Sequence, residues 1–247
     1  MSLKNIAIVI PCWMRPEILS LTVKQLNILC EENINKVNIT VIYSLSHEDP
    51  QISDVISALN FCMHKYYVVF SDNNLLGQKV NDAITIAISL DFDYIMNLGS
   101  DDLIHPDLID LYLPFLEMEI PFFGLASVWF YKSGEKPFCF QNYNSNYLIG
   151  AGRMIHKKVI NKVNDKFGSL YNPSINRGMD THSANKIMEC GFKQIFVYDG
   201  KHPLIVDIKS DINIHSYEAI RSANFVETDS EINILEYFPV LKANEQN

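Results

Sequence analysis

Short apolar runs alternate with helical patterns through the N-terminal part of the chain, and this alternation constrains the fold more than any other feature. Four runs have the length of buried strands: 5–11, 37–43, 66–70 and 94–98. The segment after the first run places Leu19, Val23 and Leu26 at helical spacing. The pattern predicts an α/β fold with a central, mostly parallel sheet and helices on both faces.

The second half of the chain is less regular. Five further strands are expected there: 122–131, 137–141, 148–155, 192–198 and 204–208. A turn at 132–135 should join the first two as a hairpin. Helices are expected at 52–64, after His156 and near Asp180.

Composition excludes several classes of protein. A net charge of −9 argues against broad nucleic-acid binding, which needs a cationic surface. Five cysteines without a CxxC pair predict reduced thiols rather than a zinc cluster or a disulfide framework. No apolar run approaches the about 20 residues that span a bilayer, and the N-terminus lacks the pattern of a signal peptide. We therefore expect a cytoplasmic protein.

Two adjacent carboxylates follow the apolar run at 94–98. Asp101 and Asp102 come directly after a Gly-Ser turn, at the end of a predicted strand where open α/β sheets bind ligands. Neighbouring carboxylates raise each other's pKa, and a divalent cation such as Mg or Mn relieves the repulsion. The alternative is that they are turn residues, or cap the helix that begins near Pro106.

Other candidate residues lie at predicted loops and helix starts. Trp13 and Arg15 follow the first strand and could stack on a base and pair with phosphate. Lys79 lies near the start of a helix that could face an anion, although its glycine pattern matches no phosphate loop. Asp180 begins another helix. The alternatives are a packed tryptophan, a solvated arginine and a simple helix cap.

The order of these features resembles the inverting glycosyltransferases of the GT-A fold, family 2-like, over residues 5–200. Four blocks carry the resemblance: Ile8–Pro16, Gly77–Ala83, Asn97–Asp102 with Pro106-Asp107, and Gly150–Ile155 followed by Met179-Asp180. The resemblance implies a nucleotide-diphospho-sugar donor bound by the following residues: Pro11, Trp13, Arg15, Ser44, Gly77, Lys79, Asn81 and Ser100.

The resemblance also implies a metal and a base. Asp101 would bind Mn²⁺ or Mg²⁺, with Asp102 as second ligand or support. His215, or alternatively His202, would complete the metal site from the C-terminal side. Asp180 would be the catalytic base that takes a proton from the acceptor hydroxyl, and a single displacement would invert the anomeric configuration.

Three residues depart from the resembled pattern. Gly99 stands where the first Asp of Asp-x-Asp is common, Ser44 replaces the Asp that reads a uracil edge, and Met179 replaces a Glu. These departures keep open a non-catalytic sugar-nucleotide-binding or assembly module of the same fold. A nucleotidyltransferase is less favoured, because Cys12–Arg15 is not a glycine-rich basic loop.

The resemblance divides the chain into 1–104, a nucleotide-sugar-binding half, and 105–208, an acceptor-binding half, followed by a C-terminal extension at 209–247. The acceptor would be a glycan, a lipid-linked glycan or another hydroxyl, met by the loops at 143–147 and 168–177. The sequence does not identify the sugar, the base or the oligomeric state.

Overall fold

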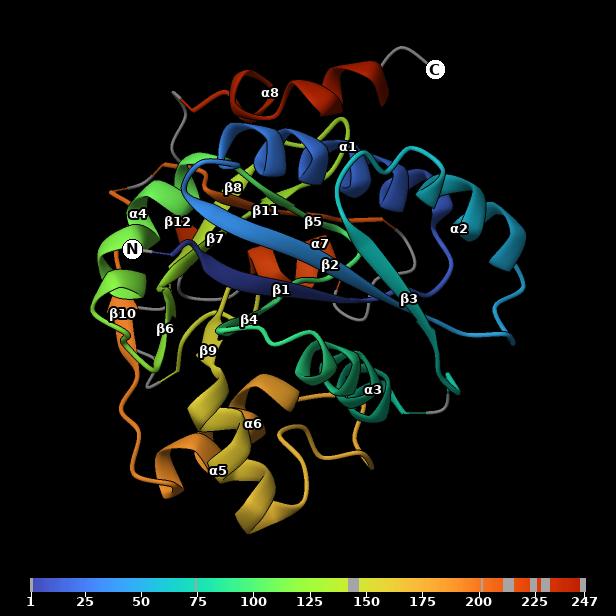
Figure 1. The fold of residues 1–247 in the computed structure, drawn as a ribbon. Helices are drawn as coiled ribbons and strands as arrows, with labels where there is room; N and C mark the ends of the chain where they lie inside the picture. Colours follow the sequence, from blue (N-terminus) through green and yellow to red (C-terminus); the bar gives the residue numbers. More distant parts are fainter. Residues whose placement is uncertain are drawn as a thin grey trace.

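A computed structural model describes residues 2–73, 75–141, 147–200, 202–210, 216–222, 226–227 and 232–244. Within these ranges the chain builds a seven-stranded and a five-stranded sheet with helices packed around them (Figure 1). The mixed α/β architecture expected from the alternating pattern is confirmed. No helix in the described ranges is long and apolar enough to cross a membrane.

The seven-stranded sheet has the order β10-β6-β9-β4-β1-β2-β3. Its strands are β1 (Lys4–Pro11), β2 (Val37–Leu45), β3 (Tyr66–Phe70), β4 (Tyr94–Asn97), β6 (Phe122–Leu125), β9 (Met154–His156) and β10 (Ile195–Val197). Strands β4, β1, β2 and β3 are parallel, whereas β9 runs antiparallel to both β4 and β6. The parallel strands therefore end at one edge of the sheet.

Helices cover both faces of this sheet. One face carries α1 (Pro16–Glu32), α2 (Ile52–Leu59) and α4 (Asp107–Glu117), and the other carries α3 (Leu76–Ser89), α5 (Lys157–Phe167) and α6 (Met179–Glu189). Figure 1 shows α1 above the sheet and α3, α5 and α6 below it. In β1, Ile6 and Ile8 pack in the first core and Ala7 and Val9 in the second. This two-sided burial explains the continuous apolar run.

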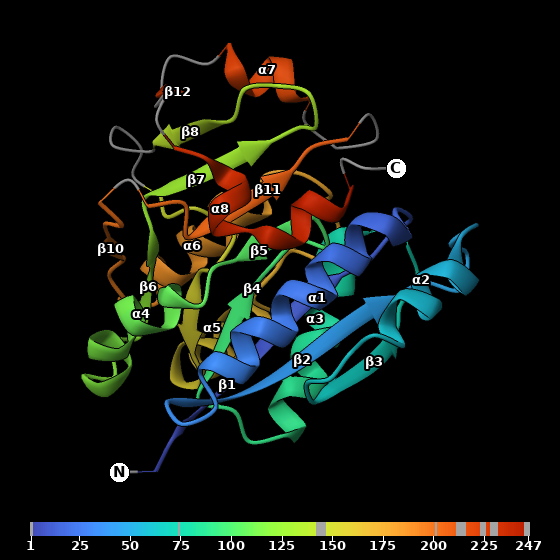
Figure 2. The ribbon, with the colours of Figure 1, turned by 90° about the horizontal axis from the view of Figure 1, so that it is seen from above.

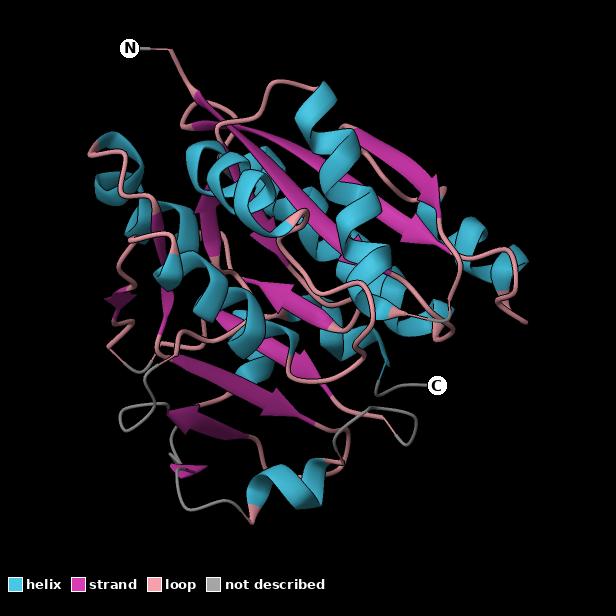
Figure 3. Cartoon of the chain, turned by 90° about the horizontal axis from the view of Figure 1, so that it is seen from below, coloured by secondary structure: helices cyan, strands magenta, loops and turns pink. Residues whose placement is uncertain are grey.

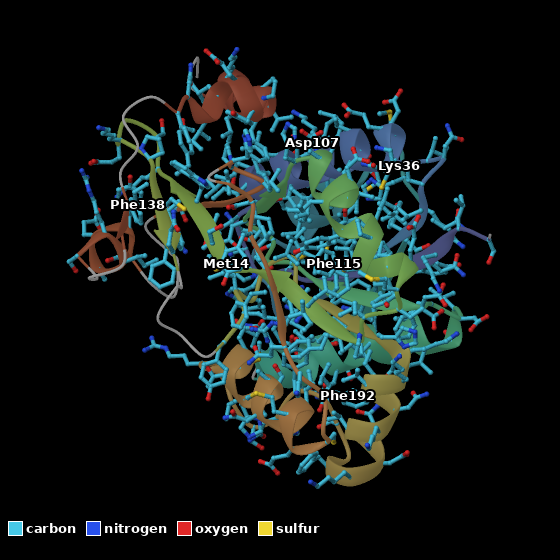
Figure 4. All side chains as sticks on the ribbon, turned by 90° about the vertical axis from the view of Figure 1, so that its left-hand side faces the viewer. Met14, Lys36, Asp107, Phe115, Phe138 and Phe192 are labelled. Atoms are coloured by element: carbon cyan, nitrogen blue, oxygen red, sulfur yellow. The ribbon has the colours of Figure 1, made fainter. Side chains whose placement is uncertain are left out.

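Figure 4 labels one phenylalanine on each side of the central sheet, Phe115 and Phe192. Phe115 of α4 lies in the middle of the view, and its ring stacks on that of Phe123 in β6 with centroids 5.3 Å apart. Phe192 lies beside α5 and α6 at the edge of the second core.

The five-stranded sheet lies to one side of the central sheet (Figure 3). Its order is β12-β8-β7-β11-β5, with β5 (Asp102–Ile104), β7 (Ser127–Tyr131), β8 (Phe138–Gln141), β11 (Ile205–Ile208) and β12 (Val226–Glu227). The C-terminal part adds α7 (Tyr217–Arg221), α8 (Ile234–Tyr237) and the 3₁₀ helix η1 (Pro239–Asn244). In Figure 2, α8 lies between α1 and β11, where Phe238 joins Leu21 and Val206 in a third core.

Two expected strands are wrong in extent. The single strand expected at 122–131 is two strands, because the chain leaves the central sheet after Leu125 and enters the smaller sheet at Ser127. Of the strand expected at 148–155, only its end is extended. Gly152 has a positive φ of 71° and its carbonyl accepts a hydrogen bond from Tyr112, so this segment turns. The helix expected at 52–64 ends at Leu59.

A loop that follows α5 closes the start of α3. The Leu76 amide donates to Asn176 Oδ1 at 2.7 Å, and the Gly77 amide donates to the Ile175 carbonyl at 3.3 Å. A Cβ on Gly77 would lie 2.0 Å from the Asn172 carbonyl oxygen. Only glycine at position 77 therefore lets the loop approach the start of α3 this closely. The first amides of α3 donate to this loop, so they do not form an open anion site.

We predict that Gly77→Ala destabilises the protein by about 1–3 kcal/mol, the usual cost of overpacking, despite the better helix propensity of alanine. Urea unfolding followed by circular dichroism measures the change. Thr85→Ala, on the exposed side of the same helix, should change the free energy of unfolding by less than about 0.5 kcal/mol. Equal stability of both variants would show that the loop does not depend on the contact.

Candidate functional site

Three carboxylates meet where the chain passes from the central sheet to the smaller one. β4 ends at Asn97, and β5 begins at Asp102 in the other sheet. The antiparallel register of β11 on β5 sets Asp207 opposite Asp102. One carboxylate oxygen from each of Asp101, Asp102 and Asp207 lies within 4.8 Å of the others.

Two cations and one backbone amide hold these carboxylates. Arg15 Nη1 lies 2.7 Å from Asp101 Oδ2, and Lys209 Nζ lies 2.6 Å from Asp207 Oδ2. The Gly99 amide donates to Asp102 Oδ2 at 2.6 Å. Both cationic side chains are largely buried, with 17% of Arg15 and 7% of Lys209 exposed. Charge-assisted contacts of this kind are stronger than neutral hydrogen bonds.

Mutual repulsion remains within the group. Burial and, next, the neighbouring Asp101 carboxylate raise the pKa of Asp102 to about 7. Burial, then Asp101 and Asp102, also raise the pKa of Asp207 well above its ordinary value. Asp207 Oδ1 is buried, and no hydrogen-bond partner for it lies within the described part of the chain. Hard oxygen atoms grouped in this way fit a divalent cation such as Mg²⁺ or Mn²⁺.

Asp207 is a residue that sequence reasoning missed. The sequence does carry a sign of it, namely a charged side chain between Val206 and Ile208 in an otherwise apolar strand. Burying a charge in a strand is unfavourable unless the charge is paired or binds a metal. His215, expected to complete the metal site, lies outside the described residues. His202 is exposed beside Tyr237, and the carboxylate group found in the described chain does not include it.

The loop after β1 is held in an unusual conformation. Met14 and Arg15 both have positive φ, 55° and 56°, which is uncommon for residues other than glycine. Asp49 holds them in place, because its carboxylate accepts from the Met14 amide at 2.6 Å and from the Gln51 amide at 2.8 Å. Gln51 in turn accepts from the Arg15 amide at 3.1 Å. The strained loop delivers the Arg15 guanidinium to Asp101.

Lys79 ties together the loops that follow the first three strands. Its ammonium group donates to the Cys12 carbonyl, to Ser46 Oγ at 2.8 Å and to Asn73 Oδ1 at 3.3 Å. It also lies 5.6 Å from the ring centroid of Trp13. The residue is 2% exposed, and this burial lowers the pKa of Lys79. Lys79 is thus bound to protein acceptors beside the partly exposed Trp13.

The other residues expected to bind the sugar-nucleotide donor do not all lie near the carboxylates. Ser100 Oγ accepts from Arg15 Nη2 at 3.4 Å, so it belongs with the carboxylates. Asn81 exchanges hydrogen bonds with the backbone of Tyr171, at 2.9 and 3.1 Å, and braces the loop. Ser44 is fully buried and its hydroxyl lies 3.1 Å from that of Ser71. The structure therefore brings Ser100 to the carboxylates but not Ser44 or Asn81.

A pocket of about 210 Å³ is lined both by Asp102, one of the three grouped carboxylates, and by Asp180. It is lined by Val9, Pro11, Leu76, Val80, Asn97, Leu98, Gly99, Asp102, Gly150, Ala151, Tyr171, Met179 and Asp180. A larger cavity of about 700 Å³ lies at the amino ends of β1 and β2, where Asn5 and Val37 line it. Parallel sheets bind ligands at the opposite edge, so the smaller pocket is the candidate site.

Asp180 occupies the first turn of α6 and lines this pocket. Its side chain is 56% exposed, and one of its oxygens would lie 2.3 Å from a Cβ on Gly150. Arg153 is fully buried behind it, with Nη1 3.0 Å from the Asp180 carbonyl and 3.8 Å from Asp180 Oδ1. Gly150 and Arg153 together fix where the Asp180 carboxylate lies.

Solved structures share this architecture. No protein-family model matches the chain, and no curated protein sequence matches it. Staphylococcus aureus TarS 1-349 in complex with UDP-GlcNAc aligns at TM-score 0.59 and 12% identity, over 97% of this chain and 65% of that one. The Pyrobaculum calidifontis mannosyltransferase PcManGT, in complex with GDP-Man and Mn²⁺, aligns at TM-score 0.56 and 13% identity, over 99% of this chain and 70% of that one.

A third neighbour is GalNAc-T7 with UDP, GalNAc and Mn²⁺, at TM-score 0.52 and 14% identity, over 84% of this chain and 44% of that one. The protein has the GT-A fold. The fold expected from the sequence is confirmed, and its neighbours are glycosyltransferases. The GT-A chain described here spans about two thirds of TarS and less than half of GalNAc-T7.

We predict that wild-type protein in EDTA loses stability relative to Asp102→Asn as the pH rises from about 4 to 7. The folded state has the higher pKa, so it binds the extra proton in this range and loses that advantage above it. Between pH 4 and pH 8 the difference in unfolding free energy should shift in favour of the variant by over about 1.4 kcal/mol, the value of one pKa unit.

Urea unfolding at a series of pH values measures this effect. Asp165→Asn, on the exposed face of α5, is the matched control and should follow the wild type. Parallel pH curves for wild type and Asp102→Asn would contradict the raised pKa.

Proposed function

We propose that this GT-A protein transfers a sugar from a nucleotide-diphosphate donor to an acceptor hydroxyl, with inversion and with the help of Mn²⁺ or Mg²⁺. The observation that carries the proposal is a pocket that two carboxylates line. One is Asp102, which belongs to the group of three at the switch between the two sheets, and the other is Asp180.

The donor would lie across the carboxyl ends of the first strands. Trp13 offers a partly exposed ring for the base, with the Lys79 ammonium beside it. Asp101, Asp102 and Asp207 would hold the metal. A bound divalent cation would neutralise the charge that grows on the departing diphosphate. Arg15, which pairs with Asp101, would contact the same diphosphate.

Asp180 would act on the acceptor. Its exposed carboxylate can be reached from solvent, and it would accept the proton of the acceptor hydroxyl. The acceptor oxygen forms a bond to the anomeric carbon while the bond from that carbon to the diphosphate oxygen breaks and its electron pair leaves with the diphosphate. One displacement from the opposite face inverts the configuration. Arg153 would be a positioning residue for this base.

Neighbouring structures support the donor class and the metal. TarS is described with UDP-GlcNAc, PcManGT with GDP-Man and Mn²⁺, and GalNAc-T7 with UDP, GalNAc and Mn²⁺. A nucleotide-sugar donor and a Mn²⁺-type ion are therefore the ligands that we infer for the pocket and the carboxylates of this chain.

A second candidate is a binding module that has lost turnover. Two of the three carboxylates already pair with Arg15 and Lys209, so protein cations balance part of the charge that a metal would balance. In such a module a nucleotide sugar would bind and remain intact. Donor turnover separates the two candidates, because fold alone does not decide function.

We predict that Asp180→Asn lowers donor turnover by about 100-fold or more, because proton transfer of this type contributes about 10²–10⁴-fold. Release of free nucleoside diphosphate from a sugar nucleotide, with water or a simple alcohol as acceptor, is the measurement. Calorimetry should find the donor affinity nearly unchanged. Normal turnover in the variant would contradict the base assignment, and no turnover in the wild type would favour the binding module.

We predict that Asp101→Ala and Asp207→Asn each weaken Mn²⁺ binding by at least about 10-fold, because each removes an oxygen ligand. Electron paramagnetic resonance of free Mn²⁺ titrated with protein measures this without any donor. Asp165→Asn again serves as the control. If Asp207→Asn bound Mn²⁺ as tightly as wild type, Asp207 would not be a ligand.

A further inference from the structure

One edge of the seven-stranded sheet carries exposed apolar side chains. β3 is the last strand of this sheet, and within the described residues only β2 pairs with it. Figure 2 shows β3 on the outer side of β2. Tyr66, Tyr67, Val68 and Phe70 are between 37% and 41% exposed. The strand contains no charged residue and no proline, which are common means of protecting a sheet edge, so β3 is open to pairing with another strand.

The backbone of β3 turns alternate residues toward β2 and away from it. The Lys65 carbonyl accepts from an amide of β2 at 3.0 Å, and the Ser71 amide donates to a carbonyl of β2 at 2.9 Å. Because the direction of the backbone groups alternates along a strand, the odd-numbered residues of β3 face β2. Tyr66, Val68 and Phe70 therefore turn their N–H and C=O groups outward.

Both rows of side chains along β3 are apolar or aromatic. The register on β2 places Tyr66, Val68 and Phe70 on the face of the first core, and Tyr67 and Val69 on the face of the second core. A strand that pairs with this edge therefore meets apolar neighbours on both faces. Such a strand is best matched if it too is apolar on both faces.

A second copy of β3 meets these requirements. When the two strands run antiparallel about a two-fold axis at Val68, each Val68 lies opposite the other, and Tyr66 lies opposite Phe70 of the second copy. In this register every outward N–H and C=O group faces an outward group of the other strand. Aromatic and β-branched side chains also meet across the pair on both faces, which stabilises paired strands.

The charges at the ends of β3 are complementary in the same arrangement. The exposed Lys65 comes just before the strand, and the exposed Asp72 comes two residues after it. Antiparallel pairing sets Lys65 opposite Ser71 of the second copy and next to Asp72 there. The two-fold axis repeats this contact at the other end, so each end brings opposite charges together.

We propose that β3 is the interface of a homodimer, in which two copies pair their β3 strands antiparallel and join their central sheets into one. A two-fold axis closes the assembly at two copies and leaves no β3 edge open for further growth. The inference stands on the strand edge alone and does not depend on the proposed function.

Sedimentation equilibrium of the wild-type protein tests whether the dimer forms. Val68→Lys should raise the dissociation constant of the dimer by at least about 10-fold, because two lysines would lie directly opposite each other. Met118→Lys is the matched control, since it also replaces an exposed apolar side chain, at the end of α4, and it should leave the constant unchanged. Circular dichroism checks that both variants fold. A wild-type protein that stays monomeric up to millimolar concentration would overturn the proposal, and so would a dimer that Val68→Lys does not weaken.

Disulfide cross-linking tests the register. Tyr67 should lie opposite Val69 of the second copy at a non-hydrogen-bonded position, where Cα atoms are about 4.5 Å apart and a disulfide can form. A mixture of Tyr67→Cys and Val69→Cys proteins should therefore give a linked heterodimer on mild oxidation, identified by its mass. Each variant alone should link no more than the wild type, whose five native thiols set the background. A mixture that links no more than the separate variants would contradict the antiparallel pairing at Val68.

Discussion

Repulsion among Asp101, Asp102 and Asp207 is the constraint on which the site depends. They meet because β4 and β5 belong to different sheets and β11 pairs with β5. Arg15 and Lys209 offset part of the repulsion, and each is placed by a separate element. Arg15 needs the strained loop that Asp49 braces, whereas Lys209 continues the strand that carries Asp207. The smaller sheet is thus part of the site.

The three grouped carboxylates lower the stability of the folded protein. Buried carboxyl groups with raised pKa values are unfavourable in the folded protein at neutral pH, and strained backbone at Met14 and Arg15 adds to the cost. Such costs persist where a ligand repays them. A divalent cation would do so, since its charge favours the ionised carboxylates. Asp180, which lines the same pocket, differs from these carboxylates, because its side chain is exposed and its carbonyl accepts a hydrogen bond from the buried Arg153.

Local patterns in the sequence predicted the central sheet, the helices on its faces and the paired carboxylates, because strand and helix periods are short-range signals. Asp207 was missed because the pairing of β11 with β5 joins segments about a hundred residues apart. The break at Ala126 between β6 and β7 was also missed, since both strands are apolar and only their partners differ. Gly77 was expected to bind the donor, yet the structure explains the glycine by packing, because the Asn172 backbone leaves no room for a Cβ there. The roles of Asp101 and Asp180 remain proposals.

The central claim is that these carboxylates bind a divalent cation and, through it, a nucleoside diphosphate. Calorimetry of the wild-type protein with UDP, GDP, CDP and dTDP, each with Mn²⁺ and with EDTA, tests it most directly. We predict that one nucleotide binds with Mn²⁺ and at least about 10-fold more weakly with EDTA, because the diphosphate would lose its main cationic contact. Equal binding in EDTA, or no binding of any nucleotide, would contradict the claim.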